Sequence, residues 1–395
     1  MPEKFVYADN AATTRVSQSV LDAMLPYFGE KYGNPSSLHS KGRAASAALG
    51  DARARIAKLL GAKESEIYFT ASGSEADNWA IKGAAYANRD RGRHIVSTKI
   101  EHHAVLNSLK SLEREGFEVT LVDVDQGGRV SPEAVANAVR EDTVLVSVMT
   151  ANNEVGTIEP IAEISAAVKR KNRKTLIFTD AVQAAGTLML DVGELGVDML
   201  SLSGHKLHAP KGVGALYIRN GIRVSNLIDG GGQERSRRGG TENLPYIMGL
   251  AKALEDAVAG INENARLAAM RDRLIDGILD KIPYTRLNGA REQRLPGNVN
   301  ISFDYIEGES LLLWLDMNGI CASTGSACSS ASLAASHVLL ALGVPVESAH
   351  GSLRLSLGRD NTDDDVDYIL QVLPGIVERL RAMSPLYEKV NGSKI

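Results

Sequence analysis

The middle of the chain alternates short β-rich apolar runs with helical patterns, and this alternation limits the fold more than any other feature. Helical patterns such as IAEISAAVKRK (161–171) lie between several of the runs. Strands that alternate with helices form a mostly parallel sheet that helices cover. We therefore predict an α/β fold whose strands fall at residues 94–98, 119–124, 144–150, 175–180, 198–203 and 214–219.

The pattern changes from about residue 245, where long helical stretches replace the alternation. A chain of 395 residues is also long for one domain and typical of two. We predict a large domain over residues 15–258 and a smaller α+β domain formed by residues 1–14 and 259–395. The elements expected in the smaller domain are strands at 298–303 and 352–357, a helix at 309–318 and a final helix from Asp363.

The charge pattern excludes some classes of partner. The net charge of −4 and the lack of a Lys/Arg tract argue against a nucleic-acid-binding or membrane-surface protein. No apolar run approaches the roughly 18–20 residues that a membrane-spanning helix needs. The first residues, MPEKFVYADN, lack the charged-then-apolar order of a secretory signal. We therefore expect a cytoplasmic protein whose partners are small molecules or other proteins.

The chain contains two cysteines, Cys321 and Cys328, and their surroundings differ. Two cysteines this close in sequence do not make a disulfide framework, and reducing conditions would leave both as free thiols. Cys321 follows an apolar run and is predicted to lie in the core. Cys328 lies in ASTGSACSSASL (322–333), where small and polar neighbours offer almost nothing to bury it. Cys328 is therefore the candidate functional thiol.

Polar residues that follow the strands are candidates for a site, because ligands of open α/β sheets bind beyond the carboxyl ends of the strands. In ASGSEADN (71–78), Ser72 and Glu75 have the spacing of a capping box before a helix. Gly73 and Ser74 beside the helix start make a candidate anion site, since the free N–H groups and the helix dipole point outward. Taken alone, these residues more often describe an ordinary helix start.

A carboxylate and a lysine end two consecutive strands, Asp180 in TLIFTD and Lys206 in LSLSGHK. A pyridoxal phosphate enzyme needs such a pair side by side. The lysine amine forms an imine with the cofactor's aldehyde, and the carboxylate keeps the pyridine nitrogen protonated so that the ring accepts electrons. Considered separately, a solvated loop lysine and a cap or turn-forming aspartate remain the simpler alternatives.

A series of segments in one order resembles the cysteine desulfurases, most closely the nitrogen-fixation branch with a long cysteine loop. The matching segments run from residue 7 to about residue 360. They are YADNAATT, GNPSSLHS, EHHAVL, ANNEVG, TDAVQ, LSGHKLHAPKGVG, RRGGTEN, GSACSSASL and SLRLSLGR. One segment departs from the family: this chain reads SLAASH (332–337) where the family usually reads SLEPSH. The departure affects the exit of the cysteine loop and the docking of partners, whereas the catalytic positions match.

The resemblance implies a fold-type-I homodimer with a seven-stranded sheet that binds pyridoxal 5′-phosphate (PLP). It also implies that L-cysteine becomes L-alanine while the sulfur stays on the enzyme as a persulfide. Lys206 is then the imine lysine and the general base, and Asp180 pairs with the ring nitrogen. Gln183 reaches the ring hydroxyl, and His102 stacks on the ring and handles protons, whereas its neighbour His103 is expected on the surface.

The resemblance also assigns the phosphate and substrate contacts. Asn153 and Arg354 are expected to hold the substrate, Asn153 also next to the cofactor, and the arginine through a bidentate grip on the substrate carboxylate. The residues expected at the phosphate are Gly73, Ser74, Ser203, His205 and, from the other subunit, Thr241.

The role that the resemblance gives to Cys328 explains its unusual neighbours. The sulfur leaves the substrate as an electrophile attacked by a thiolate, so the enzyme needs a cysteine that approaches the cofactor and carries the sulfur away. Small residues around Cys328 suit a mobile arm. The expected acceptor is an iron–sulfur scaffold or another sulfur-accepting protein, and Cys328 could serve as an iron–sulfur cluster ligand during the transfer.

Two other classes of function stay open from the sequence. Selenocysteine cleavage or transamination could use the same fold, because fold alone does not decide the reaction. The thiol-bearing segment argues against transamination, which would not use it. The second class is a catalytically silent scaffold for an iron–sulfur assembly protein. The intact lysine, aspartate and cysteine argue against it.

Overall fold

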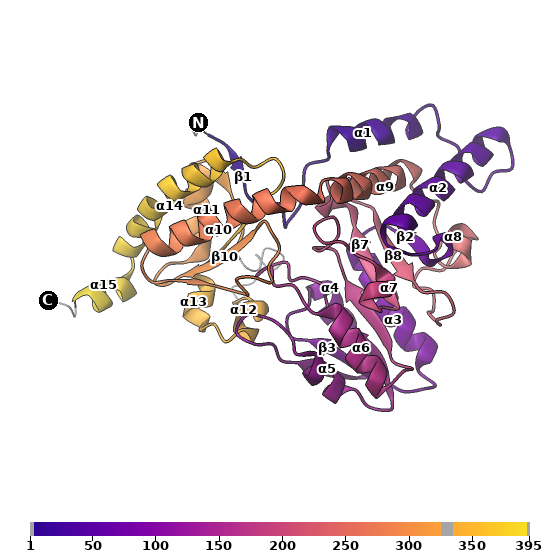
Figure 1. Ribbon diagram of the computed structural model, residues 1–395, viewed down its shortest axis with the longest axis horizontal. Coiled ribbons are helices and arrows are strands. Elements are labelled where there is room, and N and C mark those ends of the chain that lie inside the picture. The colour runs from indigo at the N-terminus through magenta and orange to yellow at the C-terminus, as the bar shows by residue number, and fades with distance from the viewer. Residues whose placement is uncertain (1–3, 325–334, 393–395) are drawn as a thin grey trace.

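The computed structural model describes residues 4–324 and 335–392, which form two bodies with separate hydrophobic cores (Figure 1). The larger body contains a seven-stranded sheet with the order β2-β8-β7-β6-β5-β3-β4. β8 is antiparallel to both of its neighbours, and all other neighbouring pairs are parallel. The strands are β2 (Ile67–Thr70), β3 (His94–Thr98), β4 (Glu118–Val122), β5 (Thr143–Ser147), β6 (Leu176–Asp180), β7 (Met199–Ser203) and β8 (Gly214–Ile218). The predicted α/β class with a mostly parallel sheet is confirmed, and β2 is the strand absent from the expected list.

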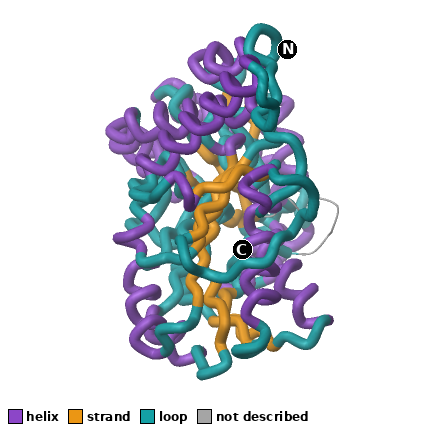
Figure 2. The backbone as a smooth tube through the Cα atoms, turned by 90° about the vertical axis from the view of Figure 1, so that its right-hand side faces the viewer, coloured by secondary structure: helices purple, strands orange, loops and turns teal. Residues whose placement is uncertain are grey.

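Helices cover both faces of this sheet, as Figure 2 shows. Side chains alternate along a strand, so a strand that is buried on both faces contributes apolar side chains to two cores. In β7, Leu200 and Leu202 pack into one core, whereas Met199 packs into the other with Trp79. The second core includes α3 (Gly73–Asn88) and α4 (His103–Arg114). The first core includes α1 (Gln18–Met24), α2 (Ser40–Leu59), α5 (Pro132–Ala138), α6 (Ile161–Lys171), α7 (Val192–Leu195) and α9 (Leu244–Ala259), and α8 (Gln233–Ser236) follows β8.

The smaller body is built on an antiparallel sheet with the order β12-β10-β9. The N-terminal strand β1 also belongs to the smaller body. It pairs in parallel with β11, and Val6 and Ala8 lie in the core of this body. Its strands are β1 (Val6–Tyr7), β9 (Thr285–Leu287), β10 (Asn298–Phe303), β11 (Ile320–Cys321) and β12 (Ser352–Ser356). Its helices are α10 (Asn264–Lys281), α11 (Gly308–Met317), α12 (His337–Ala341), α13 (Val346–His350), α14 (Asp363–Ala382) and α15 (Pro385–Gly392). The strands expected at 298–303 and 352–357 are present, and the domain boundaries stay predictions.

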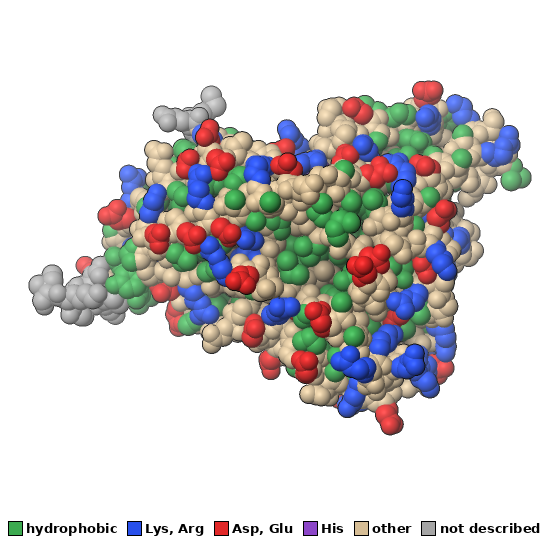
Figure 3. All heavy atoms as spheres, in the orientation of Figure 1, with side chains coloured by type: hydrophobic (Ala, Val, Ile, Leu, Met, Phe, Trp, Pro, Cys, Tyr) green, Lys and Arg blue, Asp and Glu red, His purple; other side chains and the backbone are tan. Residues whose placement is uncertain are grey.

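The surface and the helices agree with the charge pattern of the sequence. Figure 3 shows Lys and Arg side chains interspersed with Asp and Glu side chains over one face, so neither sign dominates that face. Within the described ranges, no helix is long and apolar enough to cross a membrane.

The topology gathers several connecting segments at one edge of the large sheet. β3, β5, β6 and β7 run in parallel, so the residues that follow them lie at the same edge. β2 has the same direction, because both β2 and β7 are antiparallel to β8. This carboxyl-terminal edge is where ligands of open α/β sheets bind.

Candidate active site

A cavity of about 350 Å³ opens at the carboxyl-terminal edge of the sheet, between the two bodies. The large body supplies the segments that follow β2, β3, β5, β6 and β7, and the small body supplies Ala11, Ala12, His337 and Arg354. The cavity brings together most of the residues expected from the sequence, namely Gly73, Ser74, His102, Asn153, Asp180, Gln183, Ser203, His205, Lys206 and Arg354.

Lys206 ends a short 3₁₀ turn, Gly204–Lys206, that directly follows β7. Its Nζ donates hydrogen bonds to the carbonyl oxygens of Ala11, at 2.6 Å, and Ala12, at 2.7 Å. The N-terminal segment therefore holds the amine at the floor of the cavity, so Lys206 is not the solvated loop lysine of the simpler alternative.

Asp180 ends β6, next to β7, and is buried. Its Oδ1 accepts a hydrogen bond from the backbone N–H of Val182 at 2.9 Å. Burial raises the pKa of Asp180 to about 6, although the Val182 N–H and the positive charge of Lys206 act in the opposite direction. A carboxylate with these partners at the cavity wall is suited to hold a proton on a heterocyclic nitrogen.

A second buried carboxyl group, Asp77 of α3, lies close to Asp180. Ser201 Oγ donates a hydrogen bond to Asp77 Oδ1 at 2.6 Å. Burial raises the pKa of Asp77 well above its usual range, and the charge of Asp180 raises it further. Sequence reasoning missed Asp77, because its position in the helical pattern of α3 gives no sign that it faces Asp180.

His102 precedes α4 and caps its start. Its Nδ1 accepts a hydrogen bond from the backbone N–H of Ala104 at 3.1 Å, so the neutral ring carries its proton on Nε2. Burial and the nearby charge of Lys206 lower the pKa of His102 to about 4. The imidazole is therefore neutral at pH 7 and offers an N–H donor.

The start of α3 lines the cavity at the position where the sequence predicts an anion site. Ser72 Oγ accepts a hydrogen bond from the Glu75 N–H at 3.1 Å, while Glu75 Oε2 accepts one from Ala71 N at 2.8 Å. A Cβ on Gly73 would lie 2.8 Å from a methyl of Val182 and 3.1 Å from Ser203 Cβ, so this close approach requires glycine. The exposed N–H groups of a helix start and this lack of side chain suit a phosphate.

Arg354 comes from β12 and is 2% exposed. Its Nη1 donates to the carbonyl oxygen of Asn153 at 3.0 Å, and its Nη2 donates to Asp9 Oδ1 at 3.1 Å. The Nε is buried and has no hydrogen-bond partner among the described residues. A buried guanidinium that lines a cavity is a candidate site for a carboxylate.

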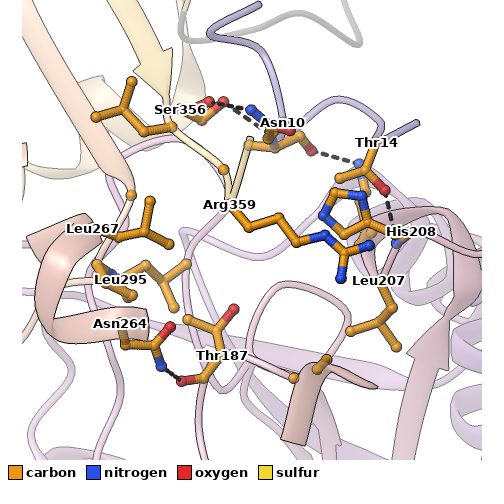
Figure 4. Close-up of a pocket in the computed structure, with 18 of the residues that line it drawn as sticks. Asn10, Thr14, Thr187, Leu207, His208, Asn264, Leu267, Leu295, Ser356 and Arg359 are labelled. Carbon is orange, nitrogen blue, oxygen red and sulfur yellow. Dashed lines mark hydrogen bonds between the residues drawn. The ribbon is translucent and has the colours of Figure 1, made fainter. Parts of the chain in front are cut away.

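A second cavity of about 190 Å³ lies behind the first, and the two share Ala11, Gln183 and Lys206. Figure 4 shows it between segments of both bodies, with Arg359 and His208 on one side and Asn264 on another. Gln183 Nε2 donates a hydrogen bond to the carbonyl oxygen of Ala11 at 3.1 Å. Ala11, together with Gln183 and Lys206 that bind its carbonyl oxygen, therefore separates the two cavities.

The sequence prediction for His103 is wrong. His103 is half-buried and lines the first cavity, with its ring centroid 4.8 Å from that of His337. His337 Nε2 donates to the carbonyl oxygen of Glu101 at 3.0 Å, so the two rings pack where α4 meets α12. The cause is long-range: α12 covers a position that opens to solvent in the isolated helix.

Cys321 also differs from its prediction, because it is half-buried in the two-residue strand β11 rather than enclosed by the core. Thr241 is exposed, and it is not among the described residues that line the first cavity of its own chain. Cys328 lies outside the described residues. Another cavity residue that the sequence did not single out is Glu154, which accepts a hydrogen bond from Ser336 Oγ.

Comparison with known proteins agrees with this geometry. The sequence model of the aminotransferase class-V family matches residues 6–369. The cysteine desulfurase IscS of Methanosarcina thermophila is 58% identical over 98% of this chain and 95% of its own length. The cysteine desulfurase IscS of Clostridium botulinum is 56% identical over 98% of this chain and 97% of its own length.

Solved structures give the same result. A NifS-like protein has a TM-score of 0.90 and 42% identity, over 95% of this chain and 100% of its own. SspA in complex with cysteine has a TM-score of 0.79 and 35% identity, over 89% of this chain and 98% of its own. This chain belongs to the class-V aminotransferase family and, within it, to the cysteine desulfurases.

Proposed function

We propose that this chain takes sulfur from L-cysteine, releases L-alanine and keeps the sulfur as a persulfide on Cys328. The observation that carries the proposal is one cavity that is lined by Lys206, Asp180 and the buried Arg354. An amine, an acid for a ring nitrogen and a carboxylate receptor are the groups that an amino-acid-converting PLP enzyme needs. The two IscS relatives and the solved complex of SspA with cysteine support L-cysteine as the substrate.

The residues of the cavity fit PLP. Gly73, Ser74, Ser203 and His205 would hold its phosphate at the start of α3, where a Cβ on Gly73 would meet Ser203. Asp180 would bind the ring nitrogen, Gln183 the ring hydroxyl and Asn153 the ring edge next to the substrate. When bound, PLP supplies an electron sink for the bond electrons of the substrate α-carbon.

The chain's own groups handle protons and orientation. Lys206 would accept the α-proton of the substrate, because its Nζ reaches the cavity from the floor. His102 would cover the ring and offer its Nε2 proton. Arg354 would fix the substrate carboxylate, and Asn153 would hold Arg354 through its carbonyl oxygen.

The sulfur step would use Cys328. Its thiolate attacks the substrate sulfur, a sulfur–sulfur bond forms, and the carbon–sulfur bond breaks with its electron pair left on carbon. That carbon then takes a proton and becomes the methyl group of alanine. We propose that an iron–sulfur scaffold or another sulfur acceptor collects the persulfide, and that the reaction occurs in the cytoplasm, where reducing conditions keep thiols free.

The direct test incubates the purified protein with L-cysteine and a reductant. We expect alanine and sulfide in equal amounts and no keto acid. Formation of 3-mercaptopyruvate, with the amino group of the substrate left on the cofactor, would indicate transamination instead. If the protein converts selenocysteine but not cysteine in a competition assay, it is a selenocysteine lyase. If it has neither bound PLP nor activity, it is a silent scaffold.

We propose a homodimer in which Thr241 reaches the phosphate of the partner's site. Its exposure, outside its own chain's cavity, supports this. Mixing impaired Lys206→Ala and Thr241→Val subunits should restore about a quarter of wild-type activity at random mixing, because half of the dimers are mixed and each has one sound site. Heterodimers purified with two tags and assayed for alanine measure this. Persistent inactivity of proven heterodimers would place Thr241 away from the partner's site.

A further inference from the structure

Asp9 lies where the substrate arginine meets the chain that leads to Cys328. A single oxygen of its carboxylate, Oδ1, accepts a hydrogen bond from Arg354 Nη2 at 3.1 Å and another from Ser323 Oγ at 2.9 Å. Ser323 lies five positions before Cys328 in the sequence. One side chain of the N-terminal segment therefore contacts both a candidate substrate residue and the segment that precedes the functional cysteine.

The backbone around Asp9 fixes these contacts. Arg354 and Ser323 pair through two backbone hydrogen bonds, of 2.7 Å from Arg354 N and 3.1 Å from Ser323 N. Asp9 itself pairs with Ser356 of the same strand, β12. Backbone pairing thus holds the segments of Asp9, Ser323 and Arg354 next to one another.

The charges make Asp9 more than a structural contact. The side chain of Arg354 is 3% exposed and that of Asp9 is 18% exposed. Asp9 is the sole carboxylate within ion-pair distance of Arg354 among the described residues. A buried cation without a counter-charge is strongly unfavourable, so the guanidinium would reorient or take up water if Asp9 were lost. The guanidinium, which lines the cavity, would then change its position there.

We propose that Asp9 is a positioning residue for this reaction, which holds Arg354 for the substrate α-carboxylate and joins it to Ser323. The inference rests on the proposed function, because it takes Arg354 as the receptor of that carboxylate. Asp9 accepts from Nη2 while the carbonyl oxygen of Asn153 accepts from Nη1, so both terminal nitrogens of the arginine are held in place. The contact with Ser323 makes the same carboxylate part of the support for the sulfur-accepting segment.

The test uses two ligands that differ by one group, L-alanine and ethylamine, titrated into the PLP-loaded protein and followed by cofactor absorbance. Wild type should prefer L-alanine. Asp9→Ala should lower the ratio of the affinity for L-alanine to the affinity for ethylamine by at least about ten-fold, which is the scale of a hydrogen bond to a charged group. The affinity for ethylamine should stay within about two-fold of the wild-type value. Asp9→Asn keeps an acceptor of the same size and should lose less than Asp9→Ala. An unchanged preference, equal weakening of both ligands, or a larger loss in Asp9→Asn would overturn the proposal.

Ser323→Ala is the matched control for the second contact. It should keep the preference for L-alanine within about two-fold of wild type, since Arg354 retains its ion pair, and should slow persulfide formation in a single turnover. Normal persulfide formation in Ser323→Ala would refute the link to Ser323. If wild type itself does not distinguish L-alanine from ethylamine, the proposed function fails, and this outcome is separate from any result with the Asp9 variants.

Discussion

Lys206→Ala should lower alanine formation from L-cysteine by at least about 1,000-fold, the scale on which removal of a central catalytic side chain acts. The reason lies in its position: the Nζ is held by Ala11 and Ala12 at the floor of the cavity, next to Asp180, and no other lysine lines that cavity among the described residues. The measurement is alanine released per subunit by protein loaded with PLP.

A covalent label tests the same residue without relying on activity. Borohydride reduction of the loaded wild type, followed by peptide mapping, should place the cofactor on Lys206. Lys211→Ala is the matched control, because Lys211 lies in the same segment but is exposed and lines neither of the two cavities described above. A label on Lys211, or full activity of Lys206→Ala, would contradict the assignment.

The residues at the strand ends were the predictable part of the site. Asp180 and Lys206 follow consecutive strands of a βαβ pattern, and β6 and β7 are neighbours in the sheet. Parallel neighbours end at the same edge, so local patterns already place the two side chains near each other. The start of α3 was also predictable, because the residues that cap a helix lie close together in the sequence.

The contacts made by the small body were not predictable from local patterns. Arg354 lies in a buried strand, and nothing near it in sequence indicates that Asp9 and the carbonyl of Asn153 hold it. Such contacts depend on how the N-terminal segment returns to β12, hundreds of positions away. The family resemblance supplied a role for Arg354, yet it did not supply the neighbour that positions it.

The prediction for His103 failed because of a long-range contact. Outside the residues given a role by the family resemblance, this histidine was expected on the surface, and the ring of His337 packs against it. The two histidines and Glu154, which accepts from Ser336, lie where the SLAASH segment meets the cavity wall. Ser336 and His337, which this chain shares with SLEPSH, therefore make specific contacts at the site, whereas Ala334 of the departure lies outside the described residues.

Cys328→Ala should bind PLP and L-cysteine normally yet release alanine at least about 1,000-fold more slowly, as expected when a nucleophile is removed. In the proposed mechanism, binding and α-proton removal use Lys206, Asp180 and Arg354, and none of these changes. Only the step that breaks the carbon–sulfur bond needs an acceptor for the sulfur. Stopped-flow absorbance with L-cysteine should therefore show rapid spectral changes that persist rather than decay.

Cys321→Ala is the matched control, since Cys321 lies in β11, is half-buried and lines neither of the two cavities described above. Burial raises the pKa of its thiol, which keeps it protonated and weakly nucleophilic at pH 7. Its variant should form alanine and persulfide at rates close to wild type. Cys328 has small and polar sequence neighbours, so its replacement should change the free energy of unfolding by less than about 1 kcal/mol. Near-normal alanine formation by Cys328→Ala would show that the sulfur leaves without this thiol, and loss of activity in Cys321→Ala alone would move the nucleophile to β11.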